Sequence, residues 1–455
     1  MNNIISINPA TEEIIRTFEP IDDSKLTDII DAARSAFIEW RFKSINVRSD
    51  LLLKMSSLLK TNIEKFSELI TLETGKPVNQ SISEIEKCAR LCEYYAENVE
   101  EFLKTEYIKT DAGESYIQYD PLGVILGIMP WNFPFWQVFR FAVPAIAGGN
   151  TVLIKHAPNV TMTAIQIENL FRDSGFPEGI FQILLVNVDR IPKIISHQYV
   201  KGVSVTASER TGSIVASHAG KEIKKTVLEL GGSDPFIILE DADINKACES
   251  GAASRLINSG QTCISAKRFI VAESLYTSFI DKFISIIQNK KMGNPMDKNT
   301  SIGPLARLDI LETLYRQVDG SVTKGARIIF HGENEQDKGY FFAPIILDNI
   351  GRNMPVYNEE TFGPVSAVIK VKDADEAVNI ANDTRFGLGA SIWTADINLA
   401  KNMAFRINAG HVSINGMVKS DPGLPFGGTG KSGYGRELSY HGCREFLNIK
   451  TIWIK

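Results

Sequence analysis

Residues 123–128 read Gly-Val-Ile-Leu-Gly-Ile, an apolar run that ends before Pro130. Such a run is typical of a strand that is covered on both faces of its sheet. Helical segments near 160–174 and 210–219 alternate with four further runs of strand-forming residues. These runs are Thr151–Lys155, Phe181–Val186, Val203–Thr206 and Val227–Leu230. Alternation of this kind predicts a parallel, doubly wound α/β sheet.

The same alternation starts again after Gly231-Gly232. The strand candidates here are Phe236–Leu239, Phe269–Val271, Arg327–Phe330, Val365–Val371 and His411–Ile414. Helices are expected near 243–258, 274–290 and 374–382. The chain is therefore predicted to contain two α/β units that meet near Gly231-Gly232.

The regions outside these units have other periods. Residues 22–107 show helical periodicity, with apolar side chains recurring on one stripe. Residues 116–119 alternate like an antiparallel ribbon, and residues 446–455 alternate again at the C-terminal end. The last segment has no obvious strand partner nearby in the sequence. We expect it to pair with a distant element of the chain or with another subunit.

Length and charge exclude several classes of protein. The 455 residues exceed what one core usually covers, which predicts two or three domains. The 49 Lys and Arg against 54 Asp and Glu give a net charge of −5, which argues against a nucleic-acid partner. The most apolar stretch, Leu122–Trp136, is interrupted by proline before it could span a membrane, and no secretory signal is visible.

The five cysteines are scattered over the chain, and no two of them have C-x-x-C spacing. A disulfide framework or a metal site is therefore not expected, and a reducing cytoplasm fits the pattern. Cys88 and Cys92 could share one helix face, but small buried side chains are the favoured interpretation over metal ligands.

Three polar residues carry candidate chemistry. Cys263 lies among small residues in Ser-Gly-Gln-Thr-Cys, which would let a ligand approach its sulfur, although a buried structural thiol is the alternative. Glu229 ends a predicted buried strand, where burial would suit a general base, or else it caps nearby backbone. Asn132 lies in an apolar turn, and its amide could face an oxyanion or satisfy its own turn.

Six motifs in fixed order carry a resemblance to a known family. They are Pro-Trp-Asn-Phe-Pro at 130–134, Lys155 with Ala157 after a strand, Leu-Glu-Leu-Gly-Gly at 228–232, Gly-Gln-Thr-Cys at 260–263, Glu-Glu-Thr-Phe-Gly-Pro at 359–364, and the glycine-rich run at 425–433. From end to end the chain resembles the aldehyde dehydrogenase superfamily, and most of all its succinate-semialdehyde dehydrogenases. The resemblance implies two Rossmann-like domains and a small β element for oligomerisation.

By this resemblance, Cys263 is the nucleophile and Glu229 the general base. Asn132 and the backbone N–H of Cys263 would form the oxyanion hole. The thiol would form a thiohemiacetal with the aldehyde. After loss of hydride it would carry a thioester, which water then hydrolyses. Ser265 stands where some members of the family carry a second, redox-active cysteine, which argues against that kind of switch.

The resemblance also implies an NAD or NADP site. Its expected residues are Trp131, Lys155, Ser208, Glu360 and Phe362. The chain departs from the usual pattern at two positions. Ala207 replaces a glycine beside the pyrophosphate, and Pro158 stands where many NAD-preferring members have Glu. The sequence therefore offers no carboxylate there to repel the 2′-phosphate of NADP.

A substrate site is implied by three further positions. Arg140 and Ser420 match the positions that hold the far carboxylate of succinate semialdehyde, and Trp136 would form an apolar wall. The alternative for Arg140 is an ion pair with Glu or Asp at a domain boundary, and the alternative for Trp136 is a core residue.

The resemblance divides the chain into three parts. Residues 1–107 and 122–231 would bind the dinucleotide, 232–430 would form the catalytic domain, and 108–121 with 442–455 would supply oligomerisation strands. The expected activity is NAD(P)-dependent oxidation of succinate semialdehyde by a cytoplasmic homodimer or homotetramer. The alternatives are another small aliphatic aldehyde as substrate, a cofactor-free thiol hydrolase, and a catalytically silent member of the fold.

Overall fold

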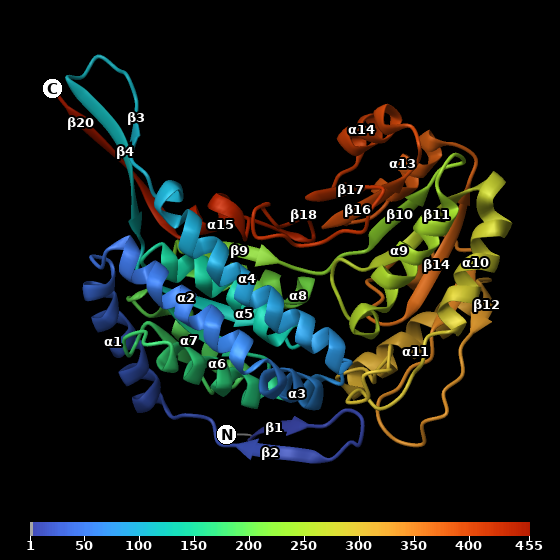
Figure 1. Ribbon diagram of the computed structural model, residues 1–455, viewed down its shortest axis with the longest axis horizontal. Coiled ribbons are helices and arrows are strands. Elements are labelled where there is room, and N and C mark those ends of the chain that lie inside the picture. Colours follow the sequence, from blue (N-terminus) through green and yellow to red (C-terminus); the bar gives the residue numbers. More distant parts are fainter. Residues whose placement is uncertain (1–2) are drawn as a thin grey trace.

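The computed structural model describes residues 3–455, and its two α/β halves lie side by side with a β arm extending from one of them (Figure 1). The first half contains a six-stranded sheet, parallel apart from β19. In spatial order its strands are β19 (Gly433–Tyr434), β9 (Lys225–Glu229), β8 (Val200–Thr206), β5 (Val124–Met129), β6 (Thr151–His156) and β7 (Phe181–Ile183). The strand predicted at 123–128 is thus confirmed near the centre of a parallel sheet.

Helices cover both faces of this sheet because successive side chains of β5 point to opposite sides. Ile125 belongs to one apolar cluster and Leu126 to the other. The first face packs against α2 (Ile45–Thr61), α3 (Ile63–Thr74), α4 (Val78–Phe102), α5 (Pro134–Ala147) and α6 (Thr161–Asp173). The second face packs against α1 (Asp23–Trp40), α7 (Ile191–Ser196) and α8 (Glu209–Lys221). The helices predicted near 160–174 and 210–219 are confirmed as α6 and α8.

The second half contains a seven-stranded sheet, parallel apart from its edge strand β12. Its order is β12 (Arg327–His331), β13 (Ile345–Asp348), β14 (Val365–Val371), β11 (Ala266–Ala272), β10 (Asp234–Ile238), β16 (Gly389–Trp393) and β17 (His411–Ile414). The helices around it are α9 (Ile244–Leu256), α10 (Tyr276–Gln288), α11 (Leu308–Val322), α12 (Pro355–Asn358), α13 (Ala374–Asn382) and α14 (Ile397–Arg406). The predicted restart of the alternation after Gly231-Gly232 is confirmed, since β9 and β10 belong to different sheets.

A three-stranded antiparallel sheet forms the arm (Figure 1). It contains β3 (Glu106–Tyr107), β4 (Glu114–Pro121) and β20 (Leu447–Ile454). The partner of the C-terminal strand is β4, with Leu447 opposite Pro121 and Ile454 opposite Glu114. The antiparallel ribbon predicted at 116–119 is therefore confirmed, and the final strand pairs within its own chain. A short hairpin of β1 (Ile4–Ile7) and β2 (Ile14–Phe18) begins the described chain.

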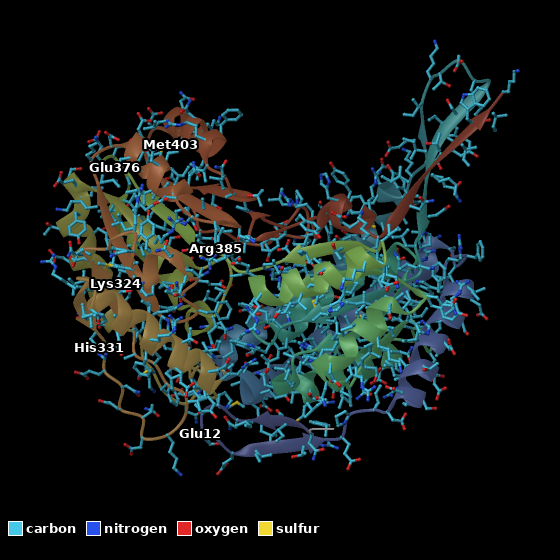
Figure 2. All side chains as sticks on the ribbon, turned by 180° about the vertical axis from the view of Figure 1, so that it is seen from behind. Glu12, Lys324, His331, Glu376, Arg385 and Met403 are labelled. Carbon is cyan, nitrogen blue, oxygen red and sulfur yellow. The ribbon has the colours of Figure 1, made fainter. Side chains whose placement is uncertain are left out.

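The C-terminal segment joins the two halves before the chain enters the arm. Its strand β18 (Thr429–Gly430) pairs with β15 (Phe386–Gly387) of the second half. The next strand, β19, pairs with β9 of the first half, and α15 (Ser439–Arg444) follows. Arg385, labelled between the two halves in Figure 2, adds an ion pair with Glu209 at 2.8 Å. This connection fixes the interface between the two halves, which we call the seam.

Across residues 3–455, no helix is long and apolar enough to cross a membrane. The interrupted apolar run at 122–136 instead forms β5, a turn and the start of α5. Pro134 is the first residue of that helix, a position where the missing N–H of proline costs no helical hydrogen bond.

Candidate active site

The carboxyl ends of four neighbouring parallel strands bring the predicted residues to one edge of the first sheet. Trp131 and Asn132 follow β5, and Lys155 lies near the end of β6. Ser208 follows β8, and Glu229 is the last residue of β9. Ligands of open α/β sheets collect at this edge, because several loops converge there.

Cys263 lies on the opposite side of the seam, in the loop between α9 and β11. Three consecutive residues before it, Asn258, Ser259 and Gly260, have left-handed backbone angles, with φ of 50°, 53° and 80°. Strained residues of this kind persist only where their surroundings hold them. Asn258 Nδ2 donates to the carbonyl of Asn132 at 2.8 Å. Ser259 Oγ donates to the carbonyl of Gly303 at 2.9 Å. The bend is thus tied to the Asn132 turn in the other half.

A cavity of about 440 Å³ opens beside Cys263. Its apolar walls include Phe133, Trp136 and Phe426, and its polar lining includes Lys87, Arg140 and Ser420. The cavity therefore combines the predicted nucleophile with all three predicted substrate residues. It has the mixed lining of a small-molecule site, where apolar walls carry a few convergent polar groups.

The thiol of Cys263 is held in its neutral form by its surroundings. Burial raises its pKa to about 12, and the positive charges of Arg140 and Lys267 oppose that rise. Lys267 Nζ donates to the carbonyl of Cys263 at 2.7 Å, so this ammonium is fixed beside the loop. Since only the thiolate is a strong nucleophile, the cations lower the cost of forming it.

Glu229 is almost fully buried, with 2% of its surface exposed. Neither carboxylate oxygen has a hydrogen-bond partner among residues 3–455. Burial holds the pKa of this carboxyl well above its usual range, Arg140 opposes the shift, and the charge of Glu437 adds to it. An unpartnered buried carboxyl is suited to accept a proton, whereas a backbone cap would be hydrogen-bonded.

Gly427 makes room for the Glu229 carboxylate. A Cβ at position 427 would lie 2.7 Å from Oε1 of Glu229, which is closer than real Cβ contacts. The glycine-rich run at 425–433 therefore has a steric role at this site, in addition to joining the two halves.

Asn132 is buried and oriented by neighbouring groups. Its Nδ2 donates to the carbonyl of Gln261 at 3.1 Å, which uses one of the two hydrogens of the amide. Gln261 lies two residues before Cys263, so this hydrogen bond places the amide beside the nucleophile loop. The turn interpretation, in which the amide only satisfies its own backbone, does not account for this contact across the seam.

Arg140, on α5, already has a carboxylate partner. Its Nε forms a buried ion pair with Glu437, and the two side chains are 2% and 4% exposed. The guanidinium also lies 4.5 Å from the ring centre of Phe426, and it donates to Thr206 Oγ1 at 3.4 Å. The ion pair is the alternative that the sequence left open. The role of Arg140 in binding a substrate carboxylate stays a prediction.

Ser420 and Trp136 share a neighbour that the sequence did not indicate. Lys87 Nζ, from α4, donates to Ser420 Oγ at 2.5 Å and lies 4.0 Å from the ring centre of Trp136. Burial and the nearby Arg140 lower the pKa of Lys87 to about 8. The sequence around it, Glu-Ile-Glu-Lys-Cys, alternates charged and apolar residues as many amphipathic helices do. It therefore does not indicate that Lys87 lines a cavity.

Trp131, Phe362 and Glu360 make up the first group of predicted cofactor residues, and Lys155 and Ser208 make up the second. Trp131 and Phe362 pack edge to face with ring centres 5.8 Å apart, and Val160 and Ala306 lie against them. Glu360 accepts the backbone N–H of Gly232 at 3.1 Å, and it lies 3.4 Å from Lys267 Nζ. Through Lys267, Glu360 lies next to the loop of Cys263.

Lys155 is a buried cation without an anionic partner among the described residues. Its Nζ donates to the carbonyl of His156 at 2.7 Å, and burial lowers its pKa to about 8. Ser208 caps the nearby helix α8 by accepting the N–H of Thr211 at 3.4 Å. An uncompensated ammonium at the strand edge fits a ligand rich in hydroxyl or phosphate oxygens, as a dinucleotide is.

Taken together, the fold and the site place the predicted nucleophile, Cys263, beside a cavity where the two α/β halves meet. The chain belongs to the aldehyde dehydrogenase family, which matches residues 2–452. The resemblance inferred from the motifs, and the fold expected from it, are confirmed by this match and by the solved structures similar to the chain.

Several similar proteins are named as succinate-semialdehyde dehydrogenases. A probable succinate-semialdehyde dehydrogenase (NADP+) of Synechocystis sp. is 44% identical over 99% of both chains. The succinate semialdehyde dehydrogenase (NAD(P)+) Sad of Escherichia coli is 42% identical over 99% of this chain and 97% of its own. The crystal structure of succinic semialdehyde dehydrogenase from Streptococcus pyogenes in complex with NADP+ is 36% identical, covers 99% of each chain and has a TM-score of 0.97.

The buried ion pair yields a first prediction. Arg140→Met should lower the free energy of unfolding by about 3–5 kcal/mol, because Glu437 would keep a buried charge without its partner. The double variant Arg140→Met/Glu437→Gln removes both charges and should recover most of this loss. Urea unfolding of the three proteins measures the difference. A single variant within about 1 kcal/mol of the wild type would show that the pair does not hold the seam.

Proposed function

We propose that the protein oxidises succinate semialdehyde to succinate with NAD or NADP as the hydride acceptor. The observation that carries the proposal is one cavity that joins the thiol of Cys263 to a cationic region around Arg140. A short substrate with an aldehyde at one end and a carboxylate at the other matches that distribution of charge. The similar succinate-semialdehyde dehydrogenases of Synechocystis sp., Escherichia coli and Streptococcus pyogenes support the same substrate.

The first half of the reaction would take place at Cys263. Its thiol gives its proton to a water molecule, and the thiolate sulfur forms a bond with the aldehyde carbon. The carbonyl π electrons move to oxygen, and the resulting oxyanion accepts hydrogen bonds from Asn132 Nδ2 and the backbone N–H of Cys263. The hydrogen bond from Asn132 to Gln261 orients the amide before the substrate arrives, so little reorganisation is needed.

The nicotinamide of the bound cofactor would supply the oxidising step by accepting the hydride from the thiohemiacetal carbon. Trp131 and Phe362 would provide apolar contact for the cofactor, and Glu360 would accept hydrogen bonds from the ribose beside the nicotinamide. Lys155 would donate to the adenosine ribose, and Ser208, at the start of α8, would lie near the pyrophosphate. These contacts would hold the cofactor between the two halves.

The second half of the reaction would hydrolyse the thioester on Cys263. Glu229 takes a proton from a water molecule, and the hydroxide oxygen forms a bond with the acyl carbon. The C–S bond then breaks, and succinate leaves as the thiolate returns. The raised pKa of Glu229 allows the carboxylate to accept that proton in a site from which bulk water is largely excluded.

Three observations separate this proposal from its alternatives. A cofactor-free thiol hydrolase would have no use for the buried, unpaired ammonium of Lys155. A dehydrogenase for an uncharged aliphatic aldehyde would have no use for Lys87 and Arg140 in the cavity wall. A catalytically silent member would not need an unpartnered Glu229 close enough to influence the pKa of Cys263.

Exposed apolar side chains on the arm favour the expected homodimer or homotetramer. Ile449, Trp453 and Ile454 of β20 are 63%, 52% and 46% exposed, and they extend with the arm beyond the body of the molecule. Apolar side chains on a projecting sheet are typical of a surface that another subunit covers. We propose that residues 108–121 and 442–455, which contain β4 and β20, form the oligomerisation element. Residues 1–107 and 122–231 would bind the dinucleotide, and residues 232–430 would form the catalytic domain. A cytoplasmic location stays a prediction.

Cys263→Ala should abolish NAD(P)H formation from succinate semialdehyde, because hydride leaves only from the thiol adduct. The variant should keep the thermal midpoint and the dinucleotide affinity of the wild type, since it removes a single sulfur atom. Absorbance of the reduced cofactor and a thermal melt measure the two properties. Appreciable turnover by the purified variant would exclude Cys263 as the nucleophile.

Glu229→Gln should slow thioester hydrolysis more than acylation, since the amide cannot take a proton from water. Rapid mixing should show a burst of NAD(P)H followed by a slow steady rate. In the wild type, steady turnover should rise with pH through the raised pKa of Glu229, because the carboxylate is the active form. The variant should lose this rise. A variant that shows no burst at normal cofactor affinity would place Glu229 before acylation.

Pro158→Glu should weaken NADP binding more than NAD binding. Residue 158 begins a short 3₁₀ turn three positions after Lys155, and a carboxylate there would repel the 2′-phosphate. A like-charge contact in a partly screened site costs on the order of 1 kcal/mol, or several-fold in affinity. Fluorescence titration with each dinucleotide measures the effect. Equal weakening of both would show that residue 158 does not face the adenosine ribose.

A further inference from the structure

Lys87 is a cation in the wall of the cavity whose charge is not neutralised by the protein. Its Nζ makes no ion pair with any residue from 3 to 455, and its hydrogen-bond partner there is the hydroxyl of Ser420 at 2.5 Å. The other close contact of Nζ is the ring of Trp136, whose centre lies 4.0 Å away. A partly buried ammonium with these two neighbours still lacks an anion.

The carboxylate nearest to Lys87 along the same helix is already used. Glu84, almost one turn earlier on α4, pairs with the buried ammonium of Lys76. Its other oxygen accepts the backbone N–H groups of Phe135 and Trp136, each at 2.9 Å. Glu84 therefore caps the start of α5 and neutralises a different lysine, and it is not free to pair with Lys87.

The other cations of the cavity are either paired with a carboxylate or exposed to water. Arg140 has its carboxylate partner in Glu437, so the ion pair satisfies most of its charge. Arg90 and Lys419 line the mouth of the cavity but are exposed, where water screens them. Asp421, the acid near the mouth, is also exposed and accepts the N–H of Gly423 at 2.8 Å. Lys87 alone among these four cations is partly buried, unpaired and turned into the cavity.

Burial without an anionic partner disfavours the charged form of Lys87. Loss of solvent, together with the nearby charge of Arg140, lowers the pKa of Lys87 to about 8. A ligand carboxylate beside Nζ would restore the favourable environment of the ammonium. The part of the cavity next to Lys87 is thus suited to an anion that enters with the substrate.

We propose that Lys87 forms the direct ion pair with the substrate's far carboxylate. Arg140, which is already paired with Glu437, would attract that carboxylate only through its longer-range electrostatic field. This inference rests on the proposed function and names the residue that selects an anionic aldehyde. Ser420 completes the subsite, because its oxygen accepts from Lys87 and its own hydrogen is then free to donate. The face of Trp136 holds the ammonium in place and lies along the path of the methylene groups.

Lys87→Met tests the proposal because methionine keeps the unbranched apolar stem and removes the charge. We expect KM for succinate semialdehyde to rise roughly tenfold to a hundredfold, as for loss of a charge-assisted hydrogen bond. With butyraldehyde, which lacks the carboxylate, KM should change less than about threefold. Lys87→Arg should recover part of the loss. Lys401→Met, which removes an exposed lysine of α14 outside the cavity, is the matched control and should behave as the wild type.

Inhibition by succinate separates this inference from the proposed function. With butyraldehyde as substrate, succinate should compete in the wild type, and Lys87→Met should weaken this inhibition roughly tenfold or more. A wild type that does not oxidise succinate semialdehyde would overturn the proposed function by itself. If the wild type does oxidise it, but Lys87→Met leaves its KM and the succinate inhibition unchanged, Lys87 is not the anchor. Equal losses with both aldehydes would likewise overturn the proposal. A thermal melt and the Lys87→Arg variant identify any loss that comes from misfolding.

Discussion

The buried ion pair of Arg140 with Glu437 is the interaction on which the site depends. It joins α5, at the centre of the first half, to the C-terminal segment that has just crossed from the second half. The same guanidinium opposes the rise in the pKa values of both Cys263 and Glu229. It also lowers the pKa of Lys87. One charge therefore fastens the C-terminal segment to α5 and shifts the pKa values of the three groups that we assign to nucleophilic attack, hydrolysis and substrate binding.

Around this pair, the site contains residues from both halves, which lie close together because the two halves are in contact. The backbone strain before Cys263 is held by a hydrogen bond to the Asn132 turn of the other half. Gly427, from the C-terminal segment, leaves the space that the Glu229 carboxylate occupies. The result is a cavity with a thiol at one place and an unneutralised ammonium at another. Such an arrangement favours a small molecule that carries its own negative charge.

The sequence predicted most strands of the two sheets, and it predicted the boundary near Gly231-Gly232. It did not predict β13, although the Ile-Ile-Leu run of that strand is apolar. It missed β16, because Gly-Ala-Ser-Ile-Trp carries little strand signal, and α5, because its residues are apolar all around the helix. At the site, motifs identified Cys263, Glu229 and Asn132, which lie in distinctive local sequences. They did not identify Lys87 or the partner of Arg140, because both depend on contacts between residues about 300 positions apart. Local periodicity contains no information on such contacts.

The proposed mechanism requires a covalent acyl group on Cys263 during turnover. Mass spectrometry of the intact Glu229→Gln protein, stopped with acid after mixing with succinate semialdehyde and NADP, detects such a group directly. We expect a mass increase of one succinyl group, located by peptide mapping on Cys263 and absent when the dinucleotide is omitted. An unmodified protein that has nevertheless produced NADPH, or an acyl group on another residue, would contradict it.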